Sequence, residues 1–271
     1  MTSQPVIIAL LATAAYASTF WYLLIHLLQK MPPSKLTTLM LLSVGLALHA
    51  LVLFPVLISS AGINYNIFNL ISLTCWLMLA FSLLFSTYRP ILGLNLLATP
   101  VACVGLLIGV IWQGPFVSLS QGGFWLDVHI FLSLAAYCVL WMASIQAILL
   151  WAQNRELKQK TTTRIWVALL PPLQSMEKLL FDMIALGFVL LTLALGFGFF
   201  TIDSFFAQHL AHKTVFSILS WLVFGTLLIG HWRLGWRGQR AISFTLWGFA
   251  LLLIGFIGSK LVLELILHIP A

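Results

Sequence analysis

Seven histidines stand out as candidates for chemistry in a chain that is otherwise mostly apolar. Lys35 marks one membrane face, and His49 lies 14 residues beyond it. At about 1.5 Å of helix rise per residue, His49 is roughly 21 Å from that face and about 9 Å from the other. His129, which follows Phe124 by five residues, lies roughly 7 to 8 Å below that other face. Two neutral imidazoles at one depth on separate helices could occupy both axial positions of a haem iron.

The same histidines also have a structural interpretation, in which each imidazole bonds a carbonyl of a neighbouring helix or lies at the membrane interface among lipid headgroups. His231 and His26 both reach the inner interface, and for His231 the two interpretations remain open. The structural interpretation is preferred for His26, His209, His212 and His268. Lys213 and Lys260 lie near the outer surface, where haem propionates could pair with a cation, although snorkelling toward the interface is the simpler explanation.

These side chains must be positioned by long apolar stretches. Of the 271 residues, 62% are hydrophobic and only 7% are charged, and the mean hydropathy is +1.09, whereas soluble domains carry about a quarter charged residues. A crossing needs about 20 apolar residues. The sequence therefore predicts an all-α polytopic integral membrane protein with about eight transmembrane helices: 5–28, 36–59, 67–85, 91–112, 124–151, 179–200, 215–231 and 241–267.

Positive charge is distributed unevenly among the connecting loops. The net charge is +7, but the cations sit in short loops beside the spans, which indicates orientation in the membrane and not a nucleic-acid partner. The positive-inside rule then places both termini outside. Eleven of the 13 basic residues fall in alternate loops, which we predict to be inner: Lys30, Lys35, Arg89, Arg155, Lys158, Lys160, Arg164, Lys178, Arg233, Arg237 and Arg240.

The longest inner segment, 152–177, combines basic residues with apolar ones and ends on Pro171 and Pro172. This mixture predicts an interfacial helix, with the sixth helix starting near Leu173. Gly105 and Gly109 have the spacing that lets one membrane helix pack closely on another. We expect residues 1–271 to form a single transmembrane domain.

Several motifs resemble the cytochrome c assembly family, which includes the CcsA, CcmC and HemX relatives. The stretch 230–240, GHWRLGWRGQR, is similar to the end of that family's histidine-bearing span and its basic loop. Residues 127–130, DVHI, and 187–193, GFVLLTL, are similar to two further family segments, and FIGSK at 256–260 is similar to the YpjD branch. The resemblance implies a haem-binding protein of the bacterial inner membrane, with His129 as an outward-side haem histidine, His231 as a membrane-embedded one, and Arg233 and Arg237 in the adjoining basic loop.

One departure from the family is informative. Haem-presenting members carry a tryptophan-rich loop between the spans that flank the site, but residues 201–211 contain no tryptophan. HemX-type relatives also lack this loop and are linked to control of haem synthesis. The resemblance therefore argues against direct haem delivery to apocytochrome and keeps a regulatory role open.

Three functions follow from these observations. The leading hypothesis is a carrier or chaperone that binds or translocates haem during cytochrome complex assembly, with His129, His49 and His231 as iron ligands and no catalysis of its own. The second is a membrane regulator or scaffold that binds no haem and stabilises a partner, including haem-pathway proteins. The third is a transporter of ions or small solutes. No nucleophile, base and orienting group occur at workable spacing, so an enzyme is disfavoured.

Overall fold

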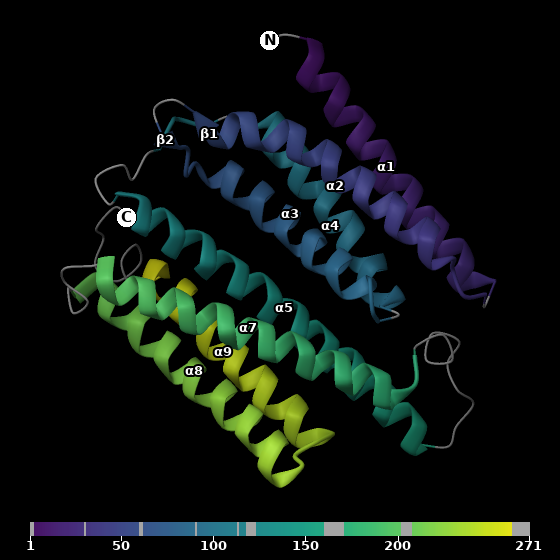
Figure 1. The fold of residues 1–271 in the computed structure, drawn as a ribbon, viewed down its shortest axis with the longest axis vertical. Helices are drawn as coiled ribbons and strands as arrows, with labels where there is room; N and C mark the ends of the chain where they lie inside the picture. Colours follow the sequence, from purple (N-terminus) through teal and green to yellow (C-terminus); the bar gives the residue numbers. More distant parts are fainter. Residues whose placement is uncertain are drawn as a thin grey trace. The chain divides into compact units, whose positions relative to one another are not determined.

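The computed structural model describes residues 3–29, 31–59, 62–89, 91–112, 114–117, 123–159, 171–201 and 208–261. In this part of the chain, seven helices are long and apolar enough to cross a membrane, and a shorter apolar helical stretch, Gln239–Gly255, forms most of α9. The predicted all-α polytopic membrane fold is confirmed. The helices are α1 (Ser3–Leu28), α2 (Lys35–Leu57), α3 (Ile67–Ser86), α4 (Leu92–Ile111), α5 (Gly123–Gln159), α7 (Leu173–Thr201), α8 (Gln208–Leu234) and α9 (Gln239–Leu261) (Figure 1).

Local capping explains where several helices begin. Ser34 precedes α2, and its side chain accepts a hydrogen bond from the Thr37 amide. Asn66 does the same for α3, where its side-chain oxygen accepts from Phe68 N at 2.9 Å. Short polar side chains at these positions satisfy first-turn amides that have no partner within the helix. The start of α4 differs, because its N-cap, Ile91, provides no side-chain hydrogen bond.

Two features were not predicted from the sequence. A short antiparallel hairpin, β1 (Ile58–Ser59) and β2 (Gly62–Ile63), follows α2. Helix α5 continues to Gln159, so the first residues of the expected interfacial segment extend a membrane helix. The start of α7 at Leu173 agrees with the expected start of the sixth span. Residues 160–170, which include the apolar part of that segment, lie outside the described residues, as does 262–267 of the eighth predicted span.

The chain divides into two compact units. Unit 1 comprises Met1–Gly123 with Thr162–Pro172 and contains α1 to α4. In this unit α1 neighbours α2 and α4, and α3 also neighbours α2 and α4, so the four helices form a closed ring. A Cβ on Gly109 would lie 2.9 Å from Cβ of Ser72. The glycine therefore allows α4 to approach α3 closely, as its spacing predicts.

Unit 2 comprises Phe124–Thr161 with Leu173–Ala271 and contains α5, α7, α8 and α9. Its helices are joined by polar contacts within an otherwise apolar interior. Ser220 in α8 donates to the Gly248 carbonyl of α9 at 2.7 Å. Gln146 in α5 donates to the Met176 carbonyl of α7 at 3.2 Å. Each contact pairs a side chain with a backbone carbonyl of a neighbouring helix, an arrangement that helps membrane helices associate.

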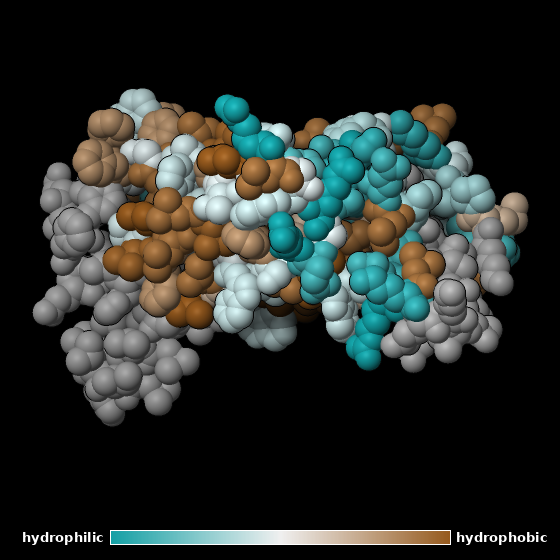
Figure 2. Space-filling model, turned by 90° about the horizontal axis from the view of Figure 1, so that it is seen from below, coloured by the Kyte–Doolittle hydropathy of each residue, from teal (hydrophilic) through white to brown (hydrophobic). Residues whose placement is uncertain are grey.

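Large apolar side chains lie exposed on the helices of both units. Leu10 is 63% exposed, Phe200 85% and Trp247 68%. In the face drawn in Figure 2, hydrophobic residues form broad brown areas beside a band of hydrophilic ones in teal. Apolar surface of this kind is expected where helices face lipid tails in place of water.

Candidate functional site

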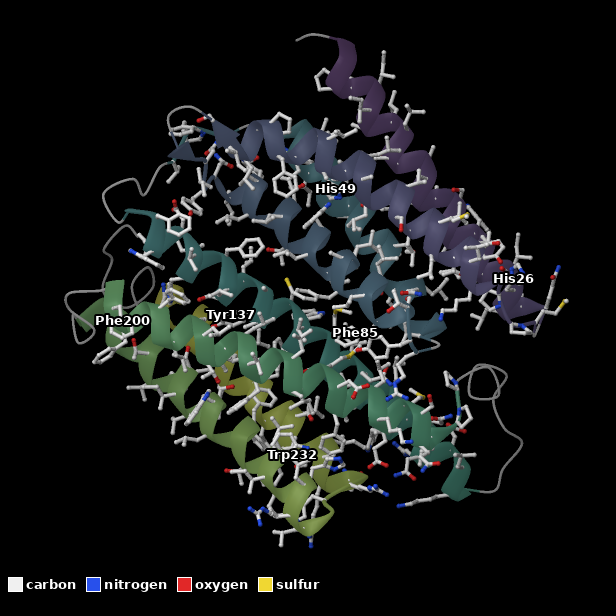
Figure 3. The ribbon with its side chains drawn as sticks, in the orientation of Figure 1. His26, His49, Phe85, Tyr137, Phe200 and Trp232 are labelled. Carbon is white, nitrogen blue, oxygen red and sulfur yellow. The ribbon has the colours of Figure 1, made fainter. Side chains whose placement is uncertain are left out.

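His49 is fully buried in unit 1, where it bridges two other helices (Figure 3). Its Nδ1 lies 3.0 Å from the hydroxyl of Tyr16 in α1, and its Nε2 lies 2.9 Å from Oγ of Ser72 in α3. Glycines make room for both partners. A Cβ on Gly45 would lie 2.5 Å from the Tyr16 ring, and a Cβ on Gly109 would lie 2.9 Å from Cβ of Ser72. The result is a buried hydrogen-bonded chain across α1, α2 and α3.

Both ring nitrogens of His49 are therefore occupied. A neutral imidazole has one N–H donor and one acceptor nitrogen, and either tautomer can satisfy the two hydroxyls. If this imidazole were to bind iron, the metal would have to replace one hydroxyl. His49 belongs to unit 1 and His129 to unit 2, so their pairing around one iron stays a prediction.

His129 has a different environment, in the second turn of α5. Its Nδ1 lies 2.7 Å from the carbonyl oxygen of Ala194 in α7. Because a carbonyl can only accept, Nδ1 carries the proton, and in the neutral imidazole Nε2 then carries the lone pair. The ring also packs on Gly198, where a Cβ would lie 2.8 Å from Cε1 of the imidazole. Among the described residues, no hydrogen bond reaches Nε2, which leaves this nitrogen able to bind a metal.

His231, near the end of α8, also uses Nδ1 to bond a backbone carbonyl. Its Nδ1 donates to the Trp236 carbonyl at 2.9 Å, and its ring stacks on Phe181 of α7 with centroids 3.6 Å apart. The helix stops just after it, because Gly235 adopts a φ of 67° and its amide donates to the His231 carbonyl. That left-handed cap suits glycine. Nε2 of this imidazole again has no hydrogen bond from the described part of the chain.

The loop between α8 and α9 is held against the start of α7. The carboxylate of Glu177 accepts a hydrogen bond from the amide of Gly238 at 2.6 Å. The Trp236 ring packs directly on Gly230, where there is no space for a Cβ. Arg240 lies 5.9 Å from the centroid of the same ring. The basic loop and the first turns of α7 therefore lie at one end of unit 2.

The other predicted residues contribute less to the geometry. Arg233 and Arg237 are exposed near His231. Lys213 is exposed in the first turns of α8, and its carbonyl oxygen would lie 3.7 Å from a Cβ on Gly255 of α9. His26 donates from Nδ1 to the Tyr22 carbonyl one turn earlier at 2.9 Å, in keeping with the structural interpretation. The side chains of Lys260, His209 and His212, and all of His268, lie outside the described residues.

Sequence reasoning did not find the partners that fix these imidazoles. The acceptors at Ala194 and Trp236 are backbone carbonyls, which carry no signature of residue type. Phe181 resembles any other apolar helix residue. Glycine is the signal that could have helped, because Gly198 allows close approach of the His129 ring and Gly230 allows close approach of the Trp236 ring. In the parts of the chain that the structure describes, no group of three or more His, Cys, Asp or Glu side chains could hold a metal ion.

Taken together, the long apolar helices define a multi-pass, all-α membrane protein. A family model described as cytochrome C assembly protein matches residues 38–267. The chain belongs to the cytochrome c assembly protein family, as its motifs predicted.

Two relatives illustrate the similarity. The inner membrane protein YpjD of Escherichia coli K12 is 29% identical over 262 residues, which cover 96% of this chain and 99% of the relative. An uncharacterized 28.8 kDa protein of Azospirillum brasilense is 30% identical over 195 residues, which cover 70% of this chain and 72% of the relative. No solved structure matches the chain.

Proposed function

We propose that this protein binds haem non-covalently within the inner membrane and carries or chaperones it during cytochrome complex assembly. The iron ligands are His129 toward the outer side and His231 toward the inner side. The whole chain, residues 1–271, serves as one functional domain. It catalyses no reaction, and its partners are haem, the lipid bilayer and other proteins of the haem pathway.

The observation that carries this proposal is the state of two imidazoles in unit 2. His129 and His231 each donate Nδ1–H to a backbone carbonyl, at 2.7 and 2.9 Å. Metal-binding histidines commonly use their second nitrogen in this way, because the hydrogen bond fixes the tautomer, orients the ring and raises the basicity of the ligating nitrogen. Both rings also pack closely, against Gly198 and Phe181 respectively. The two sites are thus ready to bind iron through Nε2 without rearrangement of the ring.

His49 would be an iron ligand at the outer side only if the metal displaced the hydroxyl of Ser72 or Tyr16 from one of its ring nitrogens. The haem propionates would be paired by Lys213 and Lys260 at the outer end and by Arg233 and Arg237 at the inner end, because charge-assisted hydrogen bonds favour carboxylates beside such cations. The lack of tryptophan in residues 201–211 favours a carrier over a protein that presents haem to an apocytochrome.

The proposal is tested by expressing the protein in haem-replete cells with an affinity tag that contains no histidine. We expect purified wild-type protein to show a Soret band and, after reduction, the α and β bands of haem. His129→Ala and His231→Ala should each reduce the haem content. His26→Ala is the matched control and should leave it unchanged, because this imidazole bonds the Tyr22 carbonyl of its own helix. A wild-type protein that purifies without haem and does not bind added haemin would contradict the proposal.

The buried chain at His49 favours a second candidate function. If all the histidines are structural, the protein is a membrane regulator or scaffold that acts through its basic inner end and binds no haem. The engagement of both His49 nitrogens supports this alternative, and so does the bond from His129 to the Ala194 carbonyl of a neighbouring helix. A transporter has less support, because no acidic cluster occurs in the middle of the predicted spans. A colourless purified protein that still binds and stabilises a membrane partner would favour the scaffold.

A further inference from the structure

Three aromatic rings lie beside His129, at the end of unit 2 where α5 begins and α7 ends. The indole of Trp125 in α5 stacks on the ring of Phe197 in α7, with centroids 5.7 Å apart and planes 18° apart. Phe124 meets the same indole edge-on at 5.5 Å. We propose that this outer aromatic cluster, Phe124, Trp125 and Phe197, contacts the porphyrin ring of haem at the His129 site. The inference rests on the proposed function and adds the residues that recognise the macrocycle.

The cluster and the imidazole are carried by the same two helices. Trp125 precedes His129 by four residues, so the two side chains are neighbours on one face of α5. On α7, Phe197 is adjacent to Gly198, which packs against the His129 ring. Ala194, one turn earlier, accepts the hydrogen bond of that ring. The contact between α5 and α7 that orients the imidazole therefore also holds the stacked pair.

The ligating nitrogen lies on the more open side of the imidazole. A Cβ on Gly198 would lie 2.8 Å from Cε1 and 3.0 Å from Nδ1 of His129, but 3.8 Å from Nε2. Nε2 is thus the nitrogen farther from this contact with α7, and the side chain as a whole is only half-buried. Because a haem is much wider than an imidazole, it has to extend from Nε2 over neighbouring residues.

The surface of the cluster suits a flat apolar ring. Trp125 remains 58% exposed although it stacks on Phe197. Phe200, near the end of α7, is also exposed (Figure 3). Stacked aromatic rings bury a large apolar area and gain from their offset geometry. The three rings of the cluster offer one polar atom, the indole nitrogen, so the cluster fits an aromatic macrocycle better than a polar ligand.

Tryptophan is also common at membrane interfaces, where it needs no ligand. Two features distinguish Trp125 from such an anchor. Its stacking partner belongs to the helix that fixes His129. A belt of interfacial anchors would use several tryptophans, whereas Trp125 is the only one in the described segments of unit 2 that reach this end, residues 123–135, 190–201, 208–220 and 250–261.

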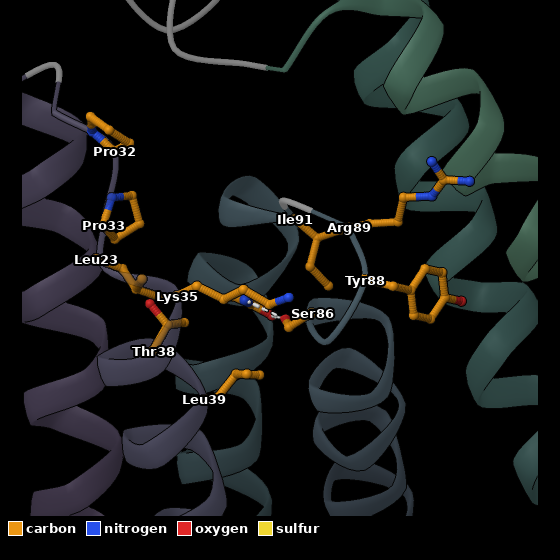
Figure 4. A pocket seen from close by; sticks show the side chains of 11 residues that line it. Leu23, Pro32, Pro33, Lys35, Thr38, Leu39, Ser86, Tyr88, Arg89 and Ile91 are labelled. Atoms are coloured by element: carbon orange, nitrogen blue, oxygen red, sulfur yellow. Dashed lines mark hydrogen bonds between the residues drawn. The ribbon is translucent and has the colours of Figure 1, made fainter.

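The pocket of unit 1 offers a contrast. It has a volume of about 250 Å³ at the end of the unit where α2 begins (Figure 4), below the roughly 300–1,000 Å³ usual for drug-sized ligands. Its buried Asn95 and Ser86 are already hydrogen-bonded to each other. Among the described residues, no histidine lines it. Neither the size nor the lining of this pocket suits a haem.

The test separates stacking from ligation by comparing haemin with metal-free protoporphyrin IX. Full-length proteins are purified in detergent in a His231→Ala background, so that the site at His129 is measured. Haemin binding is followed by the Soret band and protoporphyrin binding by fluorescence. We expect Trp125→Leu to weaken the binding of both compounds about tenfold, whereas His129→Ala should weaken the binding of haemin alone. Trp125→Phe should recover part of the loss, because it keeps an aromatic ring.

Trp141→Leu is the matched control, because Trp141 is also an exposed tryptophan of α5 with an aromatic neighbour, Phe249. It should bind both compounds as the parent protein does, and without ligand it should unfold at a temperature similar to that of Trp125→Leu. Unchanged binding of both compounds to Trp125→Leu would overturn the inference and leave the proposed function standing. Equal weakening by Trp141→Leu would indicate general adsorption to exposed indoles and would also overturn it. A parent protein that binds neither compound would contradict the inference and the proposed function together.

Discussion

The three candidate histidines differ in the hydrogen bonds that their ring nitrogens make. His49 has two hydroxyl partners, whereas His129 and His231 each have one carbonyl partner and a remaining Nε2. Depth arithmetic from the sequence found all three as candidates. It could not separate them, because hydrogen bonds to carbonyls depend on how helices are rotated against each other and not on residue type.

The contact between Gly198 and His129 gives the first residue-scale prediction. Gly198→Ala places a methyl group against the imidazole and should cost about 1–3 kcal/mol of stability through overpacking. It should also reduce bound haem, because the ring must move from the Ala194 carbonyl. Gly196→Ala is the matched control, since a Cβ there meets no atom within 4 Å, and it should keep wild-type haem content. Thermal unfolding and the Soret absorbance measure both effects, and equal behaviour of the two variants would contradict the assignment.

A second residue-scale prediction concerns the buried chain at His49. Tyr16→Phe removes one hydroxyl and leaves a buried ring nitrogen without a partner, which should lower the free energy of unfolding by about 1–3 kcal/mol. Tyr22→Phe, at the exposed end of the same helix, should cost less. Denaturation in detergent measures the difference. If Tyr16→Phe is as stable as the wild type, His49 is not held by this chain.

At the scale of helices, the sequence predicted most boundaries to within two residues, whereas α5 and α8 extend well beyond their predicted spans. The start of α3 at Ile67 agrees with the predicted span 67–85, because an apolar run begins at that residue. The end of α5 was placed too early, because polar residues 152–159 leave the membrane while remaining helical. Hydropathy reports where a helix leaves the lipid, whereas helix propensity and packing decide where it ends.

The loop between α8 and α9 gives a prediction at this scale. Glu177→Ala removes the acceptor for the Gly238 amide and should destabilise unit 2 by about 1–3 kcal/mol. Glu177→Gln keeps an acceptor oxygen and should recover part of this loss. Both effects can be followed by thermal unfolding. The same loop holds the Trp236 carbonyl that orients His231, so Glu177→Ala should also lower the haem content. A variant that is destabilised as predicted but keeps the wild-type haem content would contradict this link.

For the whole molecule, the uneven distribution of basic residues predicts both termini outside. Within unit 1, Lys35 and Arg89 line one pocket, and within unit 2 the basic loop meets the start of α7. Inside each unit, the basic loops named here therefore lie at a common end, as the rule requires. The pairing of His49 with His129 across the two units could not be derived from sequence, because equal depth does not fix which helices are neighbours.

Cysteine labelling tests this orientation. In spheroplasts, a membrane-impermeant maleimide should modify Val117→Cys directly, because residue 117 follows the fourth span on the predicted outer side. It should modify Thr87→Cys, on the inner side, only after permeabilisation. Wild-type protein is the background control, since Cys75, Cys103 and Cys138 all lie in helices. Labelling with the opposite pattern would invert the topology.

The central claim is that Nε2 of His129 binds haem iron, and imidazole rescue tests it most directly. His129→Gly removes the ligand and leaves a space for free imidazole beside Gly198. We predict that purified His129→Gly loses most of the wild-type Soret band after haemin titration, and that added imidazole restores its position and intensity. A His129→Gly protein whose haem spectrum and affinity equal those of the wild type would contradict the account.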